Sequence, residues 1–288
     1  MNNDTHTLEH LVRRACALDV QALKPGNVSV DSPGHGMNAN DFLRSATALA
    51  APITAPNLSV GERIFRAVEA TQAVVSCNTN LGIILLLAPL VQAALSGASQ
   101  LRDNLASVLF GLSQSDADWA YRAIRLAKPG GLGEVARHDV AQQPQVTLRA
   151  AMQEAASRDQ IAALYVTDYR LLFERGLPAW VRAMQQWGSP KWATTAVFLD
   201  YLAHVPDSLI ARKLGGAQSQ RVTDAAKPIW QAFHMAGEPS QMRTSLLVWD
   251  QELKQAELNP GTTADITVAT VFLASLQDMY QPIYTDTA

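Results

Sequence analysis

Leu81-Gly82-Ile83-Ile84-Leu85-Leu86-Leu87 is the stretch of sequence that decides the fold. It is apolar on every side, which is typical of a helix buried in the middle of a bundle. The whole apolar run, from Leu81 to Leu95, is shorter than the roughly 20 residues that a helix needs to cross a bilayer. We therefore expect this run to form the central helix of a core and not a membrane span.

A helical period of 3.6 residues recurs on both sides of this run, whereas strand patterns are almost missing. The first apolar stripe must end before Lys24, because Pro25 disfavours helical geometry in the residue before it. The sequence predicts an all-α fold: one large multi-helix bundle, residues 1–288, around a buried central apolar helix. The other helices are expected at about 8–22, from Asn40 as N-cap, from the Ser59–Glu62 capping box, and at 101–110, 116–127, 147–157, 160–175 with a stop at Gly176, 178–187, 190–204, 217–235, 241–257 and 263–279.

Composition excludes several classes of function. The formal net charge is −3 and Lys/Arg runs are missing, so we expect no nucleic-acid partner, since such binding needs a basic face. The first residues, Met1 to His6, lack the basic start of a signal peptide, which predicts a cytoplasmic protein with no membrane partner. Cys16 and Cys77 are the only cysteines, too few for a disulfide framework or a thiolate cluster.

Five polar, glycine-rich interruptions lie at predicted helix ends, where free N–H groups and the helix dipole favour phosphate. In the first, Lys24-Pro25-Gly26-Asn27-Val28, Lys24 either pairs with a phosphate or neutralises the end of the preceding helix. In the second, Asn78-Thr79-Asn80-Leu81-Gly82, the side chains either cap the apolar helix or bind a nucleotide. Gly82 would let a ligand approach the first turn.

The other three interruptions are equally ambiguous when taken singly. Lys128-Pro129-Gly130-Gly131-Leu132-Gly133-Glu134 is neither a Walker loop nor a Rossmann fingerprint. In the segment Asp207 to Gly216 the acid could hold Mg²⁺ while two cations meet phosphates, or the whole segment is a solvated charged loop. Asn259-Pro260-Gly261-Thr262-Thr263-Ala264-Asp265 is a turn whose hydroxyls and acid suit a helix start.

Taken in order, the five motifs resemble the triphosphoribosyl-dephospho-CoA synthase family over roughly residues 10–276. The resemblance implies an all-α transferase that moves the ribose triphosphate of ATP to the 2′-hydroxyl of 3′-dephospho-CoA and releases adenine. ATP and Mg²⁺ are the implied cofactors, and a nucleotide and a cofactor precursor are the implied partners. A homo-oligomer is left open.

The resemblance also implies roles for individual residues. The catalytic set contains three acids, Asp207, Asp265 and Glu134, which would hold Mg²⁺ or face the positive charge at C1′, and His35 as proton donor. The phosphate- and nucleotide-binding set is Lys24, Gly26, Asn27, Asn78, Thr79, Asn80, Gly82, Arg212, Lys213, Gly215, Gly216, Thr262 and Thr263.

The chain departs from the family pattern at several of these motifs. The His-Lys pair of the N-T-H-K-G motif is replaced by Asn80-Leu81, and Leu132 and Leu209 stand where the family has Arg and Asn. The resemblance is therefore to a divergent branch, which is associated with methanopterin-type cofactors. A nucleotide-dependent ribosyl or phosphoryl transferase or N-glycoside hydrolase of one-carbon cofactor biosynthesis is one alternative. A non-catalytic helical nucleotide-binding or assembly module is another.

Overall fold

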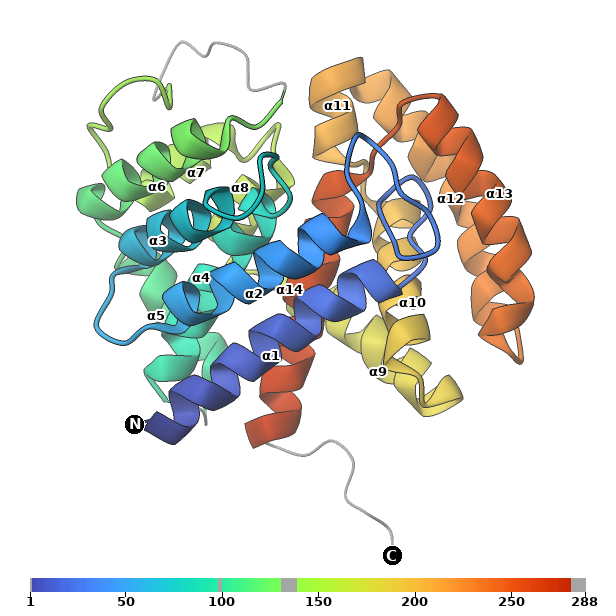
Figure 1. Cartoon of the computed structure of the whole chain (residues 1–288), viewed down its shortest axis with the longest axis horizontal. Helices are drawn as coiled ribbons and strands as arrows, with labels where there is room; N and C mark the ends of the chain where they lie inside the picture. Colours follow the sequence, from blue (N-terminus) through green and yellow to red (C-terminus); the bar gives the residue numbers. More distant parts are fainter. Residues whose placement is uncertain (1, 98–99, 131–138, 281–288) are drawn as a thin grey trace, which may run out of the picture.

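The apolar run that decides the fold forms helix α4 (Leu81–Leu95), which lies in the middle of the bundle, as predicted (Figure 1). The computed structural model describes residues 2–97, 100–130 and 139–280. Every α4 residue except Gly82, Gln92 and Leu95 is buried. No helix in the described ranges is long and apolar enough to cross a membrane.

A second core helix, α14 (Gly261–Tyr280), packs against α4 and is buried from Thr262 to Leu276 except at Asp265. Several of its buried residues carry hydroxyl groups. Thr267, Thr270 and Ser275 each donate a hydrogen bond to the backbone carbonyl four residues earlier. Because these bonds satisfy the hydroxyl groups, the helix can lie in the core although it is less apolar than α4.

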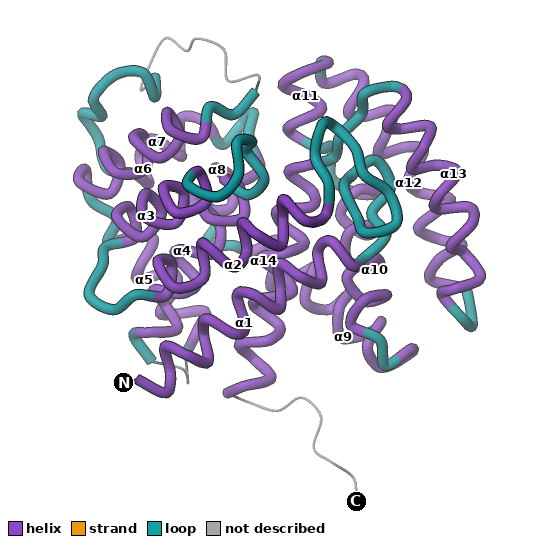
Figure 2. The backbone as a smooth tube through the Cα atoms, in the orientation of Figure 1, coloured by secondary structure: helices purple, strands orange, loops and turns teal. Residues whose placement is uncertain are grey.

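The remaining elements surround these two helices, and the described part of the chain contains no strand, as Figure 2 shows. In Figure 1, α3 to α8 lie on one side, α9 to α13 on the other, and α1 and α2 cross in front. The bounds are α1 Asn2–Gln21, α2 Ala39–Thr54, α3 Val60–Gln72, α5 Leu101–Phe110, α6 Gln114–Ala127, α7 Leu148–Ala155, α8 Gln160–Val166, η1 Leu172–Gly176, α9 Leu177–Trp187, α10 Pro190–His204, α11 Ser208–Leu214, α12 Gly216–Met235, η2 Pro239–Met242 and α13 Arg243–Gln255.

Helix starts agree with the capping signals at one of two predicted places. Ser59 caps α3 by accepting the N–H of Glu62 at 3.3 Å, as expected. The predicted N-cap Asn40 is wrong by two residues. Asn38 is the cap instead, because its side chain accepts the N–H of Asn40 while Asp41 accepts the N–H of Asn38.

The predicted stop at Gly176 is also wrong. The helix ends earlier, after Val166, where Asp168 and Tyr169 adopt positive φ angles. The chain then runs through the π-helical turn η1, and Gly176, at a helical φ of −63°, leads straight into α9. A Cβ atom on Gly176 would overlap the hydroxyl of Tyr201. Glycine is needed here for close helix packing and not to end a helix.

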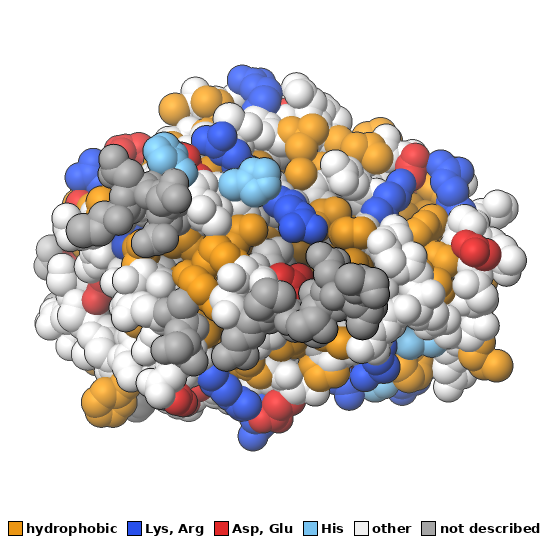
Figure 3. All heavy atoms as spheres, turned by 90° about the horizontal axis from the view of Figure 1, so that it is seen from below, with side chains coloured by type: hydrophobic (Ala, Val, Ile, Leu, Met, Phe, Trp, Pro, Cys, Tyr) orange, Lys and Arg blue, Asp and Glu red, His pale blue; other side chains and the backbone are white. Residues whose placement is uncertain are grey.

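The face that surrounds the chain ends carries no broad basic patch. Figure 3 shows this face, with Lys and Arg side chains interspersed among acidic, hydrophobic and uncharged ones over the coloured surface. The visible face therefore agrees with the small net charge of the sequence.

Candidate active site

One cavity of about 840 Å³ opens at the end of the bundle where α4, α8, α11 and α14 begin. Its walls include Leu81 of α4, Gln160 of α8, Ser208 of α11 and Thr262 of α14. Its size lies within the range of small-molecule sites, about 300–1,000 Å³. Polar residues that are far apart in the sequence therefore meet in one place, as the positions of the five interruptions suggested.

Most of the residues expected to bind or react line this cavity, but several do not. Those that line it are Asn27, His35, Asn78, Thr79, Asn80, Gly82, Arg212, Lys213, Thr262 and Asp265. Among the described residues, Lys24, Gly26, Asp207, Thr263, Gly215 and Gly216 lie outside its lining. Glu134, predicted to be a catalytic acid and metal ligand, lies outside the described residues, although Gly130 of the same loop reaches the cavity.

Lys24 is fully buried and paired within the protein. Its ammonium lies 2.7 Å from the carboxylate of Asp19 and donates a hydrogen bond of 2.6 Å to Asn27 Oδ1. Both partners line the cavity, but Lys24 does not. The lysine thus holds Asp19 and Asn27 in place, and this geometry favours neither of the two interpretations that the sequence offered for Lys24.

Asp207 is also fully buried, and four donors occupy its carboxylate. Oδ1 accepts the N–H groups of Leu209 and Ile210, which makes Asp207 the N-cap of α11. Oδ2 accepts the N–H and the hydroxyl of Thr263, at 2.7 and 2.8 Å. Because these bonds leave little room for a metal ion, the geometry favours a structural role for Asp207: it joins the start of α11 to the start of α14.

Asp265 is a cavity-lining carboxyl group that accepts no hydrogen bond from the described residues. Burial raises its pKa well above the ordinary value, and the nearby carboxylates of Asp19 and Asp207 add to the rise. The position of the Asp265 side chain depends on Gly82, because a Cβ atom on residue 82 would overlap Asp265 Oδ2. The absence of a side chain at Gly82 therefore leaves room for the Asp265 carboxyl group as well as for a ligand.

Asp19 is a neighbouring carboxyl group that, unlike Asp265, has a cationic partner. Burial raises the pKa of Asp19 as well, but the ammonium of Lys24 opposes this rise. Two neighbouring carboxyl groups have different pKa values when only one of them has a cationic partner. The cavity thus holds one acid that favours its proton, Asp265, and one whose charged form has a buried cationic partner, Asp19.

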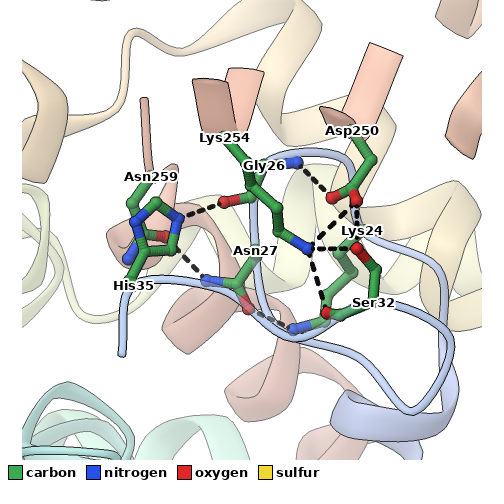
Figure 4. Close-up of polar contacts among 8 residues, drawn as sticks. All are labelled: Lys24, Gly26, Asn27, Ser32, His35, Asp250, Lys254 and Asn259. Carbon is green, nitrogen blue, oxygen red and sulfur yellow. Dashed lines mark hydrogen bonds and ion pairs between the residues drawn. The ribbon is translucent and has the colours of Figure 1, made fainter. Parts of the chain in front are cut away.

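The loop between α1 and α2 presents two polar side chains to the cavity and is held from behind by α13, as Figure 4 shows. The buried Asp250 accepts the Gly26 N–H at 2.8 Å, the Ser32 hydroxyl at 2.5 Å and the Lys254 ammonium at 3.0 Å. Gly26 has a φ of 83°, and a Cβ would lie 2.8 Å from Pro260 Cδ. Only glycine fits this position without strain.

The two side chains that the loop presents are Asn27 and His35. Asn27 donates to the side chain of Asn259 at 2.8 Å, which links the loop to the turn before α14. His35 Nε2 lies 2.8 Å from the carbonyl oxygen of Gly26. Both residues line the cavity, so the loop contributes directly to the site.

The segment before α4 lines the cavity with side chains that already have protein partners. Asn78 accepts the N–H of Leu81 at 3.1 Å, and Asn80 donates to Thr71 at 3.2 Å. The Thr79 hydroxyl pairs with that of Ser45 at 2.6 Å. These bonds fix the orientation of the segment. Its side chains therefore both stabilise the start of α4 and line the cavity.

The cations of the site gather where α7 ends and α11 lies. Arg158, Arg212 and Lys213 line the cavity, and Arg212 forms an ion pair of 3.1 Å with Asp159. The described lining residues carry more carboxylates than cations, five against three. The five are Asp19, Asp139, Glu154, Asp159 and Asp265.

Asp19, Asp159 and Asn259 are among the lining residues that the sequence analysis did not assign to the site. Asp19 lies four residues after Ala15, on the apolar face of the first helix. An acid on an apolar helix face could have indicated a site residue from the sequence alone. Asp159 precedes the predicted helix start at residue 160, and it caps α8 while pairing with Arg212. Asn259 was quoted as part of its turn, but nothing in the sequence indicated its contact with Asn27.

Comparisons with known proteins agree with this fold. The family model of ATP:dephospho-CoA triphosphoribosyl transferase matches residues 5–282. A crystal structure from Archaeoglobus fulgidus, of a protein assigned as a triphosphoribosyl-dephospho-CoA synthase, is similar with a TM-score of 0.60 and 23% identity, covering 81% of this chain and 97% of that chain. At that identity the likeness establishes the fold.

No curated protein is similar enough to count as a match. The resemblance drawn from the five motifs and the all-α prediction are both confirmed. Because the family model covers nearly the whole chain, this protein belongs to the ATP:dephospho-CoA triphosphoribosyl transferase family and is a transferase of that kind.

Proposed function

We propose that the protein breaks the bond between adenine and the ribose of ATP and joins the triphosphoribosyl group to the 2′-hydroxyl of 3′-dephospho-CoA or a related cofactor precursor. The observation that carries the proposal is the pair of cavity carboxyl groups, Asp19 and Asp265, of which only Asp19 has a buried cationic partner. Cleavage of an N-glycosidic bond needs a proton donor for the base and negative charge near C1′, and this pair supplies both.

Asp265 is assigned as the proton donor. Its raised pKa favours the protonated form of the carboxyl group, and no described protein group competes for that proton by a hydrogen bond. Departing adenine would take this proton on a ring nitrogen as the C1′–N bond breaks. The leaving group is then neutral adenine and not its anion.

Asp19 is assigned to the positive charge that develops on the ribose ring. Lys24 holds its carboxylate at 2.7 Å and opposes its protonation. A fixed carboxylate stabilises an oxocarbenium-like centre more than water does, because it needs no reorganisation during the reaction. Lys24 acts through Asp19 and so is a positioning residue.

Mg²⁺ fits this site as part of a nucleotide complex. Within the described ranges no three His, Cys, Asp or Glu side chains gather to hold a metal ion. Mg²⁺ commonly keeps its waters and takes one or two carboxylates together with substrate phosphates. Glu154, which lines the cavity beside the cations at the end of α7, would supply such a carboxylate. When bound, the ion neutralises charge on the triphosphate, which the three lining cations alone do not balance.

The test is incubation of the protein with ATP, MgCl₂ and 3′-dephospho-CoA, followed by mass spectrometry of the products. Free adenine and an acceptor carrying a triphosphoribosyl group, in equal amounts, are expected. ADP would show phosphoryl transfer, and adenine without an adduct would show hydrolysis. Either result overturns the proposal for this acceptor, and a parallel reaction with pterin-type precursors then tests the related acceptors.

Matched variants test the assignment of the acid. Asp265→Asn keeps the size of the side chain but removes the transferable proton, so we expect kcat to fall by about 10²–10⁴-fold. Asp224→Asn is the control, because Asp224 is an exposed acid on α12 that pairs with Lys227. Equal activity of the two variants would remove Asp265 from the mechanism.

A further inference from the structure

The hydrogen bond between His35 and Gly26 fixes which nitrogen of the imidazole carries the proton. A backbone carbonyl oxygen only accepts hydrogen bonds, so the Nε2 atom that lies 2.8 Å from Gly26 O must be the donor. In the neutral ring the other nitrogen, Nδ1, then has a free lone pair. His35 is therefore held in the form that accepts a proton at Nδ1.

The free nitrogen belongs to a side chain that lines the cavity. Figure 4 shows it on the side of the ring away from Gly26. No described residue forms an ion pair with His35, and its only hydrogen bond is the one to Gly26. A lone pair without a described protein partner, on a side chain that lines the cavity, is available to a substrate hydroxyl.

A contact from α13 holds Gly26, and through Gly26 it holds the ring of His35. The carboxylate of Asp250 accepts the Gly26 N–H, and Lys254 and Ser32 donate hydrogen bonds to the same carboxylate. The charged groups of α13 behind the loop, Asp250 and Lys254, are thus paired with each other. On the α1 side, Lys24 is paired with Asp19. These pairs leave the ring of His35 without a charged partner of its own among the described residues.

We propose that His35 is the general base that activates the acceptor hydroxyl, with Gly26 and Asp250 as positioning residues. This inference rests on the proposed function. The acceptor O–H bond breaks and its proton moves to Nδ1 while the oxygen forms a bond to C1′. The C1′–N bond breaks at the same time, and adenine leaves with the proton of Asp265. This role is opposite to that of proton donor, which the sequence alone suggested for His35.

The first test replaces the ring. His35 has a φ of 56°, which Asn tolerates better than most residues, so His35→Asn preserves the loop. His35→Gln is the second variant, since its amide reaches the position of Nε2 and keeps the bond to Gly26. In both we expect kcat to fall by about 10²–10⁴-fold with little change in the KM for either substrate. The decline of kcat at low pH, which protonation of the base causes, should disappear.

Chemical rescue separates a base from a merely structural side chain. Added imidazole should restore part of the activity of His35→Ala, because it can accept the proton in the space left free. Asp250→Asn should lower kcat while keeping the decline at low pH, because His35 is still the base, and imidazole should not help it. Circular dichroism and titration with Mg-ATP confirm that each variant is folded and binds nucleotide.

The outcomes distinguish the inference from the proposed function. If the unchanged protein makes no triphosphoribosyl adduct, both fall. If it makes the adduct but the His35 variants keep its kcat and pH profile, only the general base is wrong. If His35→Ala loses activity and imidazole restores none of it, a structural role for the ring replaces the catalytic one.

Discussion

At the scale of single residues, burial separates the charged side chains that pair within the protein from those that line the cavity. Lys24 and Asp207 carry charges suited to phosphate and metal, but each is fully buried and paired within the protein. A sequence pattern places such residues at helix ends without showing which way they face. That direction depends on partners far along the chain, such as Thr263 for Asp207. Asp265, by contrast, faces the cavity from the position that the sequence assigned to it.

Asp207→Ala should destabilise the protein by about 2–4 kcal/mol, because it leaves a helix without its cap and buried donors without an acceptor. Asp207→Asn keeps one acceptor oxygen and should lose about half as much. Urea unfolding followed by circular dichroism measures both. A stable Asp207→Ala protein that has lost only its metal dependence would show that Asp207 is a ligand after all.

Asp265→Asn should make the ligand-free protein more stable, and increasingly so as the pH rises above the ordinary pKa of an aspartate. The folded state keeps a proton on Asp265 that the unfolded chain releases above its ordinary pKa, so folding is disfavoured as the pH rises. The asparagine has no charge to bury and escapes this effect. Melting temperatures of both proteins across the pH range test the prediction, and a constant difference contradicts it.

At the scale of elements, periodicity was sufficient to find most helices but not their interruptions. The predicted range 101–110 coincides with α5, because a regular apolar stripe fixes a short surface helix. The helix α11 was missed, since its seven residues sit in a segment that looks like a charged loop. The turn at Asp168 and Tyr169 was also missed, because positive φ angles at these residue types leave no clear signal in a sequence.

Gly176→Ala tests the close contact between η1 and α10. Alanine suits a helix better than glycine by about 1 kcal/mol, but its methyl group would overlap the Tyr201 hydroxyl and lie 2.7 Å from Thr270 Oγ1. We expect a net destabilisation of about 1–3 kcal/mol. Removing the hydroxyl by Tyr201→Phe should recover part of this loss in the double variant, which a thermal or urea cycle measures. Strict additivity would contradict the contact.

At the scale of the whole molecule, the convergence of the polar interruptions is the part of the site that the sequence predicted best. Helices that begin at one end of a bundle bring their first turns together, so N-terminal motifs of α4 and α14 meet although they lie far apart in the chain. The balance of charge in the cavity was not predicted, because Asp19 lies within a predicted helix and Asp159 just before another, and neither was assigned to the site. This balance becomes apparent only when the residues from all the elements that line the cavity are considered together.

Mg-ATP should stabilise the folded protein more than ATP alone. At about 100 times its dissociation constant a ligand contributes about 2.7 kcal/mol, which should raise the melting temperature by about 5 °C. Because carboxylates outnumber cations among the described lining residues, free ATP should bind weakly and shift it less. Thermal scans with MgCl₂, ATP, both or neither provide the comparison. Equal shifts for ATP and Mg-ATP would argue against a metal complex.

The cavity draws on both the first and the last helix of the fold, with Asp19 in α1 and Asp265 in the opening turn of α14. During synthesis on the ribosome, a nascent chain that has not yet emerged as far as Asp265 has no complete pocket. Fragments produced by premature termination or proteolysis before that point would lack it as well. Unfinished copies therefore lack the complete pocket, which forms only when α14 has docked.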